Sequence, residues 1–344
     1  MMDLMTHGAV TAKAMTLYGR RITKGQYSEL LGKRTIAEIT AFLKNHEGYG
    51  AALVDTDERL ANRAQLEDRL RRMLFEEYLS FLKSPLKNDR IFLGLMIQRY
   101  ETEQLLSFFR YFESGRANQF IFTIPEYLIK HSSVDFEKLC GAESYEQAYE
   151  LLEGTRYQAV LKQYGYEKDK DFSQLENLLY TNYYSSIFKA TLRFKGKIGQ
   201  QLKAAAGAQI DIINLIHIIR LKRYYSTPPE QIRGHLLPFG YRLKASVLNS
   251  MINAAGVGQV MELIALSPYA ADFESEHAYL EESLHEHLYK LNKKIIRFAP
   301  VSVLKVTAYL NLKEIEARNL ISIIEGKRYS VDSGTIRQHL TGIN

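Results

Sequence analysis

The sequence contains very few of the residues that cross-link or interrupt a chain. Among 344 residues there is one cysteine, Cys140, and there are seven prolines. A single cysteine excludes an internal disulfide and any zinc site built from several cysteines, so a reducing compartment fits best. Most of the prolines stand between stretches with helical spacing, which favours long uninterrupted helices.

Long uncharged apolar runs are also missing. The first residues, MMDLMTHGAVTAKAM, have polar side chains every few positions, so we expect no signal peptide and a protein that starts in the cytoplasm. The most apolar windows, 210–221 and 295–312, are interrupted by residues such as Asp211, Arg220 and Arg297. We therefore expect no direct membrane span.

Signatures of catalysis and of bound cofactors are absent as well. Gly32-Lys33 and the segment 325–329 lack the glycine and hydroxyl positions of a phosphate-binding P-loop, and no G-x-S-x-G elbow occurs. His277, Glu281 and His285 would share one helix face and so could seat a metal, but their order is not H-E-x-x-H and such runs are commonly solvated. We expect neither a cofactor nor an active site.

The charge balance permits several kinds of partner without selecting one. The formal net charge is +6, which suits acidic proteins, anionic lipid surfaces or nucleic acid. The 23 tyrosines are dispersed and many fall at the spacing of helical core positions, so packing is a better explanation for them than base stacking. We expect no nucleic-acid partner.

One short phrase occurs three times along the chain. It reads YETEQLLSFFR at 100–110, IDIINLIHIIRLKRYY at 210–225 and IEARNLISIIEGKRYS at 315–330. Each copy has an acid, an amide three positions later, and then apolar pairs at helical spacing. The residues that define the motif, and that we take as candidate partner-contact residues, are Glu101, Gln104, Arg110, Asp211, Asn214, Arg220, Glu316, Asn319 and Lys327.

A second landmark supports a true repeat. The phrases QLEDRL at 65–70, QLENLL at 174–179 and YLEESL at 279–284 contain a glutamate that precedes the motif acid by 34, 35 and 35 residues. A helix breaker stands between the two landmarks each time, at Pro85, Gly196 and Pro300. The pattern predicts three tandem repeats of about 105–109 residues, with domains at 1–118, 119–226 and 227–344.

The spacing of apolar residues indicates an all-α protein with about five helices in each repeat, packed as three related helical bundles. The acid and the amide of the motif suit a structural role, because an acid near a helix start favours the helix dipole and an amide can satisfy a neighbouring helix end. A role in partner contact is the alternative. On that alternative, the polar helix ends near Glu101, Asp211 and Glu316 would all lie at the same end of the protein.

The triplication resembles a known family. Three helical repeats that each end in an acid-x-x-amide helix, with the last reading EARNLISIIEGK at 316–327, are similar to the central-stalk C subunit of V-type and A-type rotary ATPases, which corresponds to the d subunit of the eukaryotic enzyme. The segment 12–43 is also similar to the opening helices of that family. Two positions depart from the family pattern: Gln104 replaces the expected asparagine, and the third copy has Glu325 where the others have arginine.

The resemblance implies a non-catalytic subunit shaped as a funnel of three bundles around a pseudo-threefold axis. Its partners would be the central-stalk shaft subunits of the D and F type and the membrane proteolipid rotor ring. It would lie on the cytoplasmic side of the membrane as a peripheral part of the complex, coupling ATP turnover to proton or sodium transport. A helical scaffold or regulatory protein unrelated to ATPases is the main alternative; a nucleic-acid binder and a metalloenzyme rank behind it.

Overall fold

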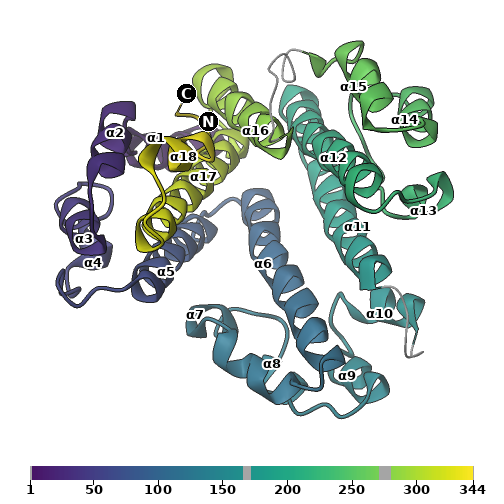
Figure 1. Ribbon diagram of the computed structural model, residues 1–344, viewed down its shortest axis with the longest axis horizontal. Coiled ribbons are helices and arrows are strands. Elements are labelled where there is room, and N and C mark those ends of the chain that lie inside the picture. The colour runs from purple at the N-terminus through teal and green to yellow at the C-terminus, as the bar shows by residue number, and fades with distance from the viewer. Residues whose placement is uncertain (1, 166–171, 271–279, 344) are drawn as a thin grey trace. The chain divides into compact units, whose positions relative to one another are not determined.

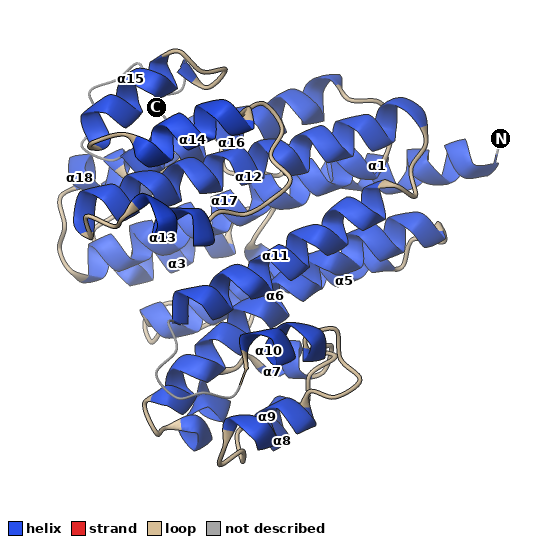
Figure 2. Ribbon diagram, turned by 90° about the vertical axis from the view of Figure 1, so that its right-hand side faces the viewer, coloured by secondary structure: helices blue, strands red, loops and turns tan. Residues whose placement is uncertain are grey.

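The protein is helical throughout the part of the chain that its computed structural model describes, residues 2–165, 172–270 and 280–343. Within those ranges there are 18 α-helices and one 3₁₀ helix, and no strand. Figure 2 shows this uniform helical content. The expectation of an all-α fold is therefore confirmed.

Several helices begin at side chains that satisfy their first free N–H groups. Thr23 opens α2 (Lys24–Gly32) and Asn62 opens α5 (Arg63–Leu82), and each forms a reciprocal capping box with a glutamine three residues later. Asp332 opens α18 (Ser333–Gln338) by accepting bonds from the N–H groups of Gly334 and Thr335. These polar residues fix where the helices start.

The chain divides into two compact units, residues 1–93 with 281–344, and residues 94–280. The chain crosses from the first unit to the second inside α6 (Lys87–Glu113), and it returns to the first unit after Leu280. Besides α2, α5, α18 and the start of α6, the first unit contains α1 (Met2–Gly19), α3 (Ile36–Lys44), α4 (Gly50–Leu53), α16 (Leu280–Phe298) and α17 (Val303–Arg328).

Helix α17 is the centre of the first unit. It packs against α1, α3, α5 and α18, so the two ends of the chain share one core, as Figure 1 shows for the purple and yellow segments. Leu30, Leu43 and Leu70 from the N-terminal part are fully buried with Leu320 and Ile323 of α17. Burial of a leucine or isoleucine side chain stabilises a fold by about 1.5–3 kcal/mol, so this shared core holds the chain ends together.

The second unit contains the rest of α6 and a series of shorter helices around one long hairpin. Its helices are η1 (Ala117–Thr123), α7 (Glu126–Ile129), α8 (Phe136–Leu139), α9 (Tyr145–Leu151), α10 (Gln158–Tyr164), α11 (Phe172–Thr191), α12 (Gly196–Tyr224), α13 (Pro229–Gly234), α14 (Ala245–Asn253) and α15 (Val257–Ala265). Helix α12 packs against α11, α13 and α15.

The predicted helix breakers lie at the turns between successive long helices. Pro85 falls between α5 and α6, and Pro300 falls between α16 and α17. Gly196 is the first residue of α12, with a φ of 60° that favours glycine. The sequence landmarks on either side of each breaker therefore belong to two consecutive helices.

The three long helices α6, α12 and α17 also end in a similar way. A residue with left-handed backbone follows each of them: Gly115 at φ 69°, Ser226 at φ 49° and Ser330 at φ 55°. Left-handed φ is uncommon for residues other than glycine, so the two serines mark sharp helix ends.

Among the described helices, α12 alone has the length and apolar composition of a membrane span. However, 56% of its most apolar window is buried inside the protein, as in the core helix of a folded domain. Its motif residues Asp211 and Asn214 are also buried, at 1% and 2% exposure.

Candidate functional site

The acids of the repeated motif lie near the middle of the three long helices, and all three are buried. The expectation that they stand near a helix start, where the helix dipole would favour them, is therefore wrong. Glu101 on α6, Asp211 on α12 and Glu316 on α17 are between 1% and 7% exposed. A carboxylate removed from water needs hydrogen-bond donors from the protein. Each of the three acids has its own set of donors.

Asp211 is held by a loop that follows α13. One carboxylate oxygen accepts a bond from the backbone N–H of Tyr241 at 3.1 Å, and the other accepts bonds from Arg242 N–H at 2.6 Å and Leu243 N–H at 3.2 Å. The hydroxyl of Tyr269 donates to the second oxygen at 2.7 Å. Four donors thus converge on one buried carboxylate, which fixes the loop to α12.

The same loop comes very close to the acid. A Cβ atom on Gly240 would collide with Oδ1 of Asp211, so any other residue at this position would displace the carboxylate. The preceding Phe239 has a φ of 75°, a conformation that non-glycine residues rarely adopt. The loop backbone is therefore shaped around the carboxylate.

Glu101 makes the same kind of contacts in the loop before α8. Its carboxylate accepts a bond from the backbone N–H of Ser133 and bonds from the hydroxyls of Ser132 at 3.0 Å and Ser133 at 3.2 Å. The hydroxyl of Tyr157 donates to it at 3.0 Å. Burial and the neighbouring Glu101 carboxylate raise the pKa of Tyr157 well above its ordinary value, so this phenol stays a donor at neutral pH.

Glu316 receives its donors from the other end of the chain. The backbone N–H of Ile22 donates at 2.8 Å, and the hydroxyl of Tyr49 also donates to the carboxylate. The ammonium group of Lys313, 4% exposed, lies 2.9 Å from the carboxylate and 3.9 Å from the centre of the Tyr49 ring. Burial first, and then the Glu316 charge, raise the pKa of Tyr49 well above 10.

Two of the three motif amides each form two hydrogen bonds with the backbone of a single residue. Asn214 donates to the carbonyl of Leu237 at 2.9 Å and accepts from its N–H at 2.8 Å. Asn319 donates to the carbonyl of Thr341 at 2.9 Å and accepts from its N–H at 3.0 Å. Gln104 makes no such pair within the described ranges, which agrees with its departure from the family pattern.

The basic residues of the motif lie nearer the surface. Arg110 is exposed, 3.6 Å from the Glu176 carboxylate and 5.0 Å from the ring centre of Phe172. Arg220 is exposed on α12. Lys327 is partly buried and donates to the carbonyl of Leu31 at 2.6 Å and to the hydroxyl of Ser333 at 2.7 Å. The exposed arginines are thus the motif side chains best placed to meet another protein.

The motif lysine has a counterpart that sequence reasoning did not single out. Lys222, eleven positions after Asp211, donates to the carbonyl of Ala254 at 2.6 Å, as Lys327, eleven positions after Glu316, does to Leu31. Both carbonyls lie at the C-terminal end of a short helix, α14 or α2, where a cation is favourable. Copies two and three of the motif share Lys-Arg-Tyr, at 222–224 and 327–329, and this match was the available signal.

The tyrosines that contact the acids were also missed. Tyr157 and Tyr269 follow Glu101 and Asp211 by 56 and 58 residues, a nearly constant offset that could have been found in the sequence. Tyr49 instead precedes Glu316 by 267 residues. Only the fold reveals that Tyr49 belongs to the third acid.

The other candidate chemistry has little support. No group of three or more metal-binding side chains is found among the described residues. His277 of the cluster 277–285, which the sequence did not favour as a metal site, lies outside the described residues, so the cluster is not tested. Burial raises the pKa of the Cys140 thiol, which lowers its reactivity. The three motif carboxylates are already hydrogen-bonded to the chain itself, which favours a structural role over proton transfer.

Comparison with known proteins agrees with the sequence motifs. A family model described as the ATP synthase (C/AC39) subunit matches residues 10–339. The C subunit of the A-type ATP synthase from Methanosphaera stadtmanae is 23% identical over 354 positions, covering 99% of this chain and 89% of that protein. The C subunits from Thermococcus gammatolerans and Methanocaldococcus jannaschii are 23% and 21% identical, covering 90% and 99% of this chain and 82% and 88% of those proteins.

Proposed function

Because this chain belongs to the ATP synthase (C/AC39) subunit family of A-type and V-type rotary ATPases, we propose that it couples the central shaft of such an enzyme to its ion-carrying membrane ring. The observation that carries the proposal is the family match over residues 10–339, nearly the whole chain. The resemblance drawn from the repeated motif is confirmed at the level of the family. The family is a non-catalytic part of a membrane-associated complex.

The proposed partners are the shaft subunits of the D and F type on one side and the proteolipid ring on the other. The protein would bind them on the cytoplasmic side of the membrane without spanning it, and ATP hydrolysis or ion flow elsewhere in the complex would turn it. The net charge of +6 favours docking to acidic partner surfaces, mainly through a faster association rate that weakens with salt.

We also propose that the chain consists of three repeats, 1–118, 119–226 and 227–344, arranged as a funnel with pseudo-threefold symmetry. Three observations support the repeats: each long helix follows a breaker, carries a buried acid, and ends at a left-handed residue. Each acid also accepts bonds from a loop N–H and a tyrosine hydroxyl.

The motif residues would serve coupling by making the protein stiff. A protein that transmits torque must not deform under load, and closely packed helices with satisfied buried polar groups resist deformation. In this proposal the acids and amides fasten the small helices to the long ones. The exposed Arg110 and Arg220 are the motif residues that would contact partners directly.

The proposal is tested by recovering tagged protein from gently solubilised membranes of its own cells. Co-purification of a proteolipid ring and shaft subunits, with a yield that falls as salt rises, is the expected result. The test variant is the double substitution Arg110→Gln and Arg220→Gln, which should fold normally and recover fewer partners. Recovery of soluble partners alone would contradict coupling and support the helical scaffold instead.

A further inference from the structure

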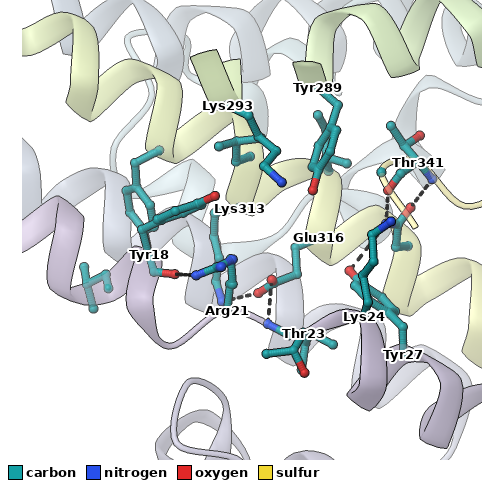
Figure 3. A pocket seen from close by; sticks show the side chains of 17 residues that line it. Tyr18, Arg21, Thr23, Lys24, Tyr27, Tyr289, Lys293, Lys313, Glu316 and Thr341 are labelled. Carbon is teal, nitrogen blue, oxygen red and sulfur yellow. Dashed lines mark hydrogen bonds and ion pairs between the residues drawn. The ribbon is translucent and has the colours of Figure 1, made fainter. Parts of the chain in front are cut away.

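A pocket in the first unit has an unusual charge balance. It lies among the end of α1, the start of α2, and the facing sides of α16 and α17, and its volume is about 140 Å³ (Figure 3). That is roughly ten times the ~10–15 Å³ that a single water needs, so a small polyatomic group fits. All residues that line it belong to the first unit.

Four basic side chains and one acid line this pocket. The basic residues are Arg21, Lys24, Lys293 and Lys313, and the acid is Glu316. Glu316 already accepts bonds from Lys313, from the N–H of Ile22 and from the hydroxyl of Tyr49. The Lys313 ammonium group therefore neutralises the Glu316 carboxylate, and the other three basic side chains leave the pocket with a net positive charge.

Two of the cations, Arg21 and Lys293, have no carboxylate partner among the described residues. Arg21 contacts the carbonyl of Tyr18 at 3.1 Å and lies 4.4 Å from the centre of the Tyr18 ring. Lys293 lies 5.2 Å from the centre of the Tyr289 ring. Neither forms an ion pair with any acid in the described ranges, although both tyrosine rings line the same pocket. The rings hold the two cations in place at its wall.

The direction of α2 adds to this positive potential. The helix spans nine residues and begins at Lys24, in the pocket wall, so the positive end of its dipole lies at the site, while the N–H of Gln26 is already capped by Thr23. The cations thus come from two parts of the chain: Arg21 and Lys24 from the turn between α1 and α2 and the first residue of α2, and Lys293 from α16. Such an arrangement suits a group whose oxygens point in several directions and carry two negative charges.

We propose that this pocket binds a phosphoryl group. A carboxylate would present one charge and two oxygens in a plane, whereas a phosphoryl group offers more oxygens and a second charge to the basic side chains Arg21, Lys24 and Lys293 that line the pocket. The group comes either from free orthophosphate or from the end of a larger phosphorylated molecule. The inference does not depend on the coupling function, because it concerns the isolated chain.

The test is calorimetric titration of the full chain with orthophosphate, pyrophosphate and ATP at constant ionic strength. Saturable binding with one site is expected, weakened about tenfold in Lys293→Met or Arg21→Gln, the loss of one charge-assisted contact. If orthophosphate binds as tightly as pyrophosphate and ATP, the ligand is the free ion. If only pyrophosphate and ATP bind, the ligand is a larger phosphorylated molecule.

The matched control is Lys294→Met, which removes the same charge from the neighbouring position of α16; both lysines are exposed, but Lys294 does not line the pocket. Its affinity should stay within roughly twofold of the parent, since only a general surface charge is lost. Thermal unfolding of each variant checks that the fold is intact. Absence of saturable binding, or an equal loss in Lys294→Met, would overturn the proposal.

Discussion

Asp211 in the second unit and Glu316 in the first are both buried carboxylates, but they accept hydrogen bonds from different kinds of donor. Asp211 takes three consecutive backbone N–H groups and a tyrosine hydroxyl, all from residues 30 to 58 positions downstream. Glu316 takes a single N–H and a tyrosine hydroxyl from far upstream, and adds the ammonium group of Lys313. At Glu316 the ammonium group of Lys313 thus takes the place of the additional backbone N–H donors that bind Asp211.

The difference has consequences for which part of the chain each acid holds. Asp211 fastens a loop to the helix just before it in sequence, whereas Glu316 fastens residues 22 and 49 to a helix near the C-terminus. Loss of the Glu316 contacts should therefore loosen the closure between the chain ends. Loss of the Asp211 contacts should act within the second unit alone.

The largest effect is expected from breaking the buried ion pair. Glu316→Gln leaves Lys313 buried without its counter-charge, which should lower the free energy of unfolding by about 3–5 kcal/mol. The double variant with Lys313→Met should lose less than the single variant, because no lone charge remains. Urea unfolding measures both, and hydrogen exchange at residues 22–53 locates the change.

The matched control on the same helix is Arg318→Met. Arg318 lies 3.9 Å from Glu314 and is half exposed, so its removal should change the free energy of unfolding by less than about 1 kcal/mol. A double variant that unfolds as easily as Glu316→Gln alone would show that the charge balance between Lys313 and Glu316 is unimportant.

A smaller effect is expected at Asp211. Asp211→Asn keeps the shape but turns an NH₂ group toward donors, so the free energy of unfolding should fall by about 2–3 kcal/mol. Hydrogen exchange should rise at 241–243 and stay unchanged at 22–53. Glu262→Gln, an exposed change on α15, is the control. Faster exchange at 22–53 in Asp211→Asn would argue against separate roles for the two acids.

The three motif amides should differ in how much they contribute to the free energy of unfolding. Asn214→Ala and Asn319→Ala each remove a two-bond contact with a backbone segment, so each should lower the free energy of unfolding by about 1–2 kcal/mol. Gln104→Ala, at the corresponding position of the first copy, should change it by less than about 0.5 kcal/mol. Equal losses at all three positions, measured by urea unfolding, would contradict this distinction.

The smallest effect concerns pH. Burial lowers the pKa of His217 in the folded protein below its ordinary value of 6.5. The unfolded chain therefore binds a proton first, and the stability that neutral His217 contributes is present above pH 6.5 and is lost as the pH falls through the folded-state pKa. His217→Gln should flatten the fall in unfolding free energy between neutral and mildly acidic pH. An unchanged slope would exclude this histidine as its source.

Sequence reasoning found the parts of the site that repeat at short, constant offsets. The acids, the amides and the breakers Pro85, Gly196 and Pro300 were identified because helices preserve spacing. The backbone N–H groups of residues 241–243 were not, since any residue but proline supplies one. Tyr49 was missed because its partner stands 267 residues away, and the common core of the two chain ends has no local pattern at all.

The most direct test of the coupling role compares ATP hydrolysis with ion uptake in vesicles that hold the rotary complex with and without this chain. With the chain present, hydrolysis should drive ion uptake. In its absence, hydrolysis by the catalytic subunits should continue while uptake is lost, and adding the chain back should restore it. Ion uptake that proceeds equally well without the chain would contradict the proposed function.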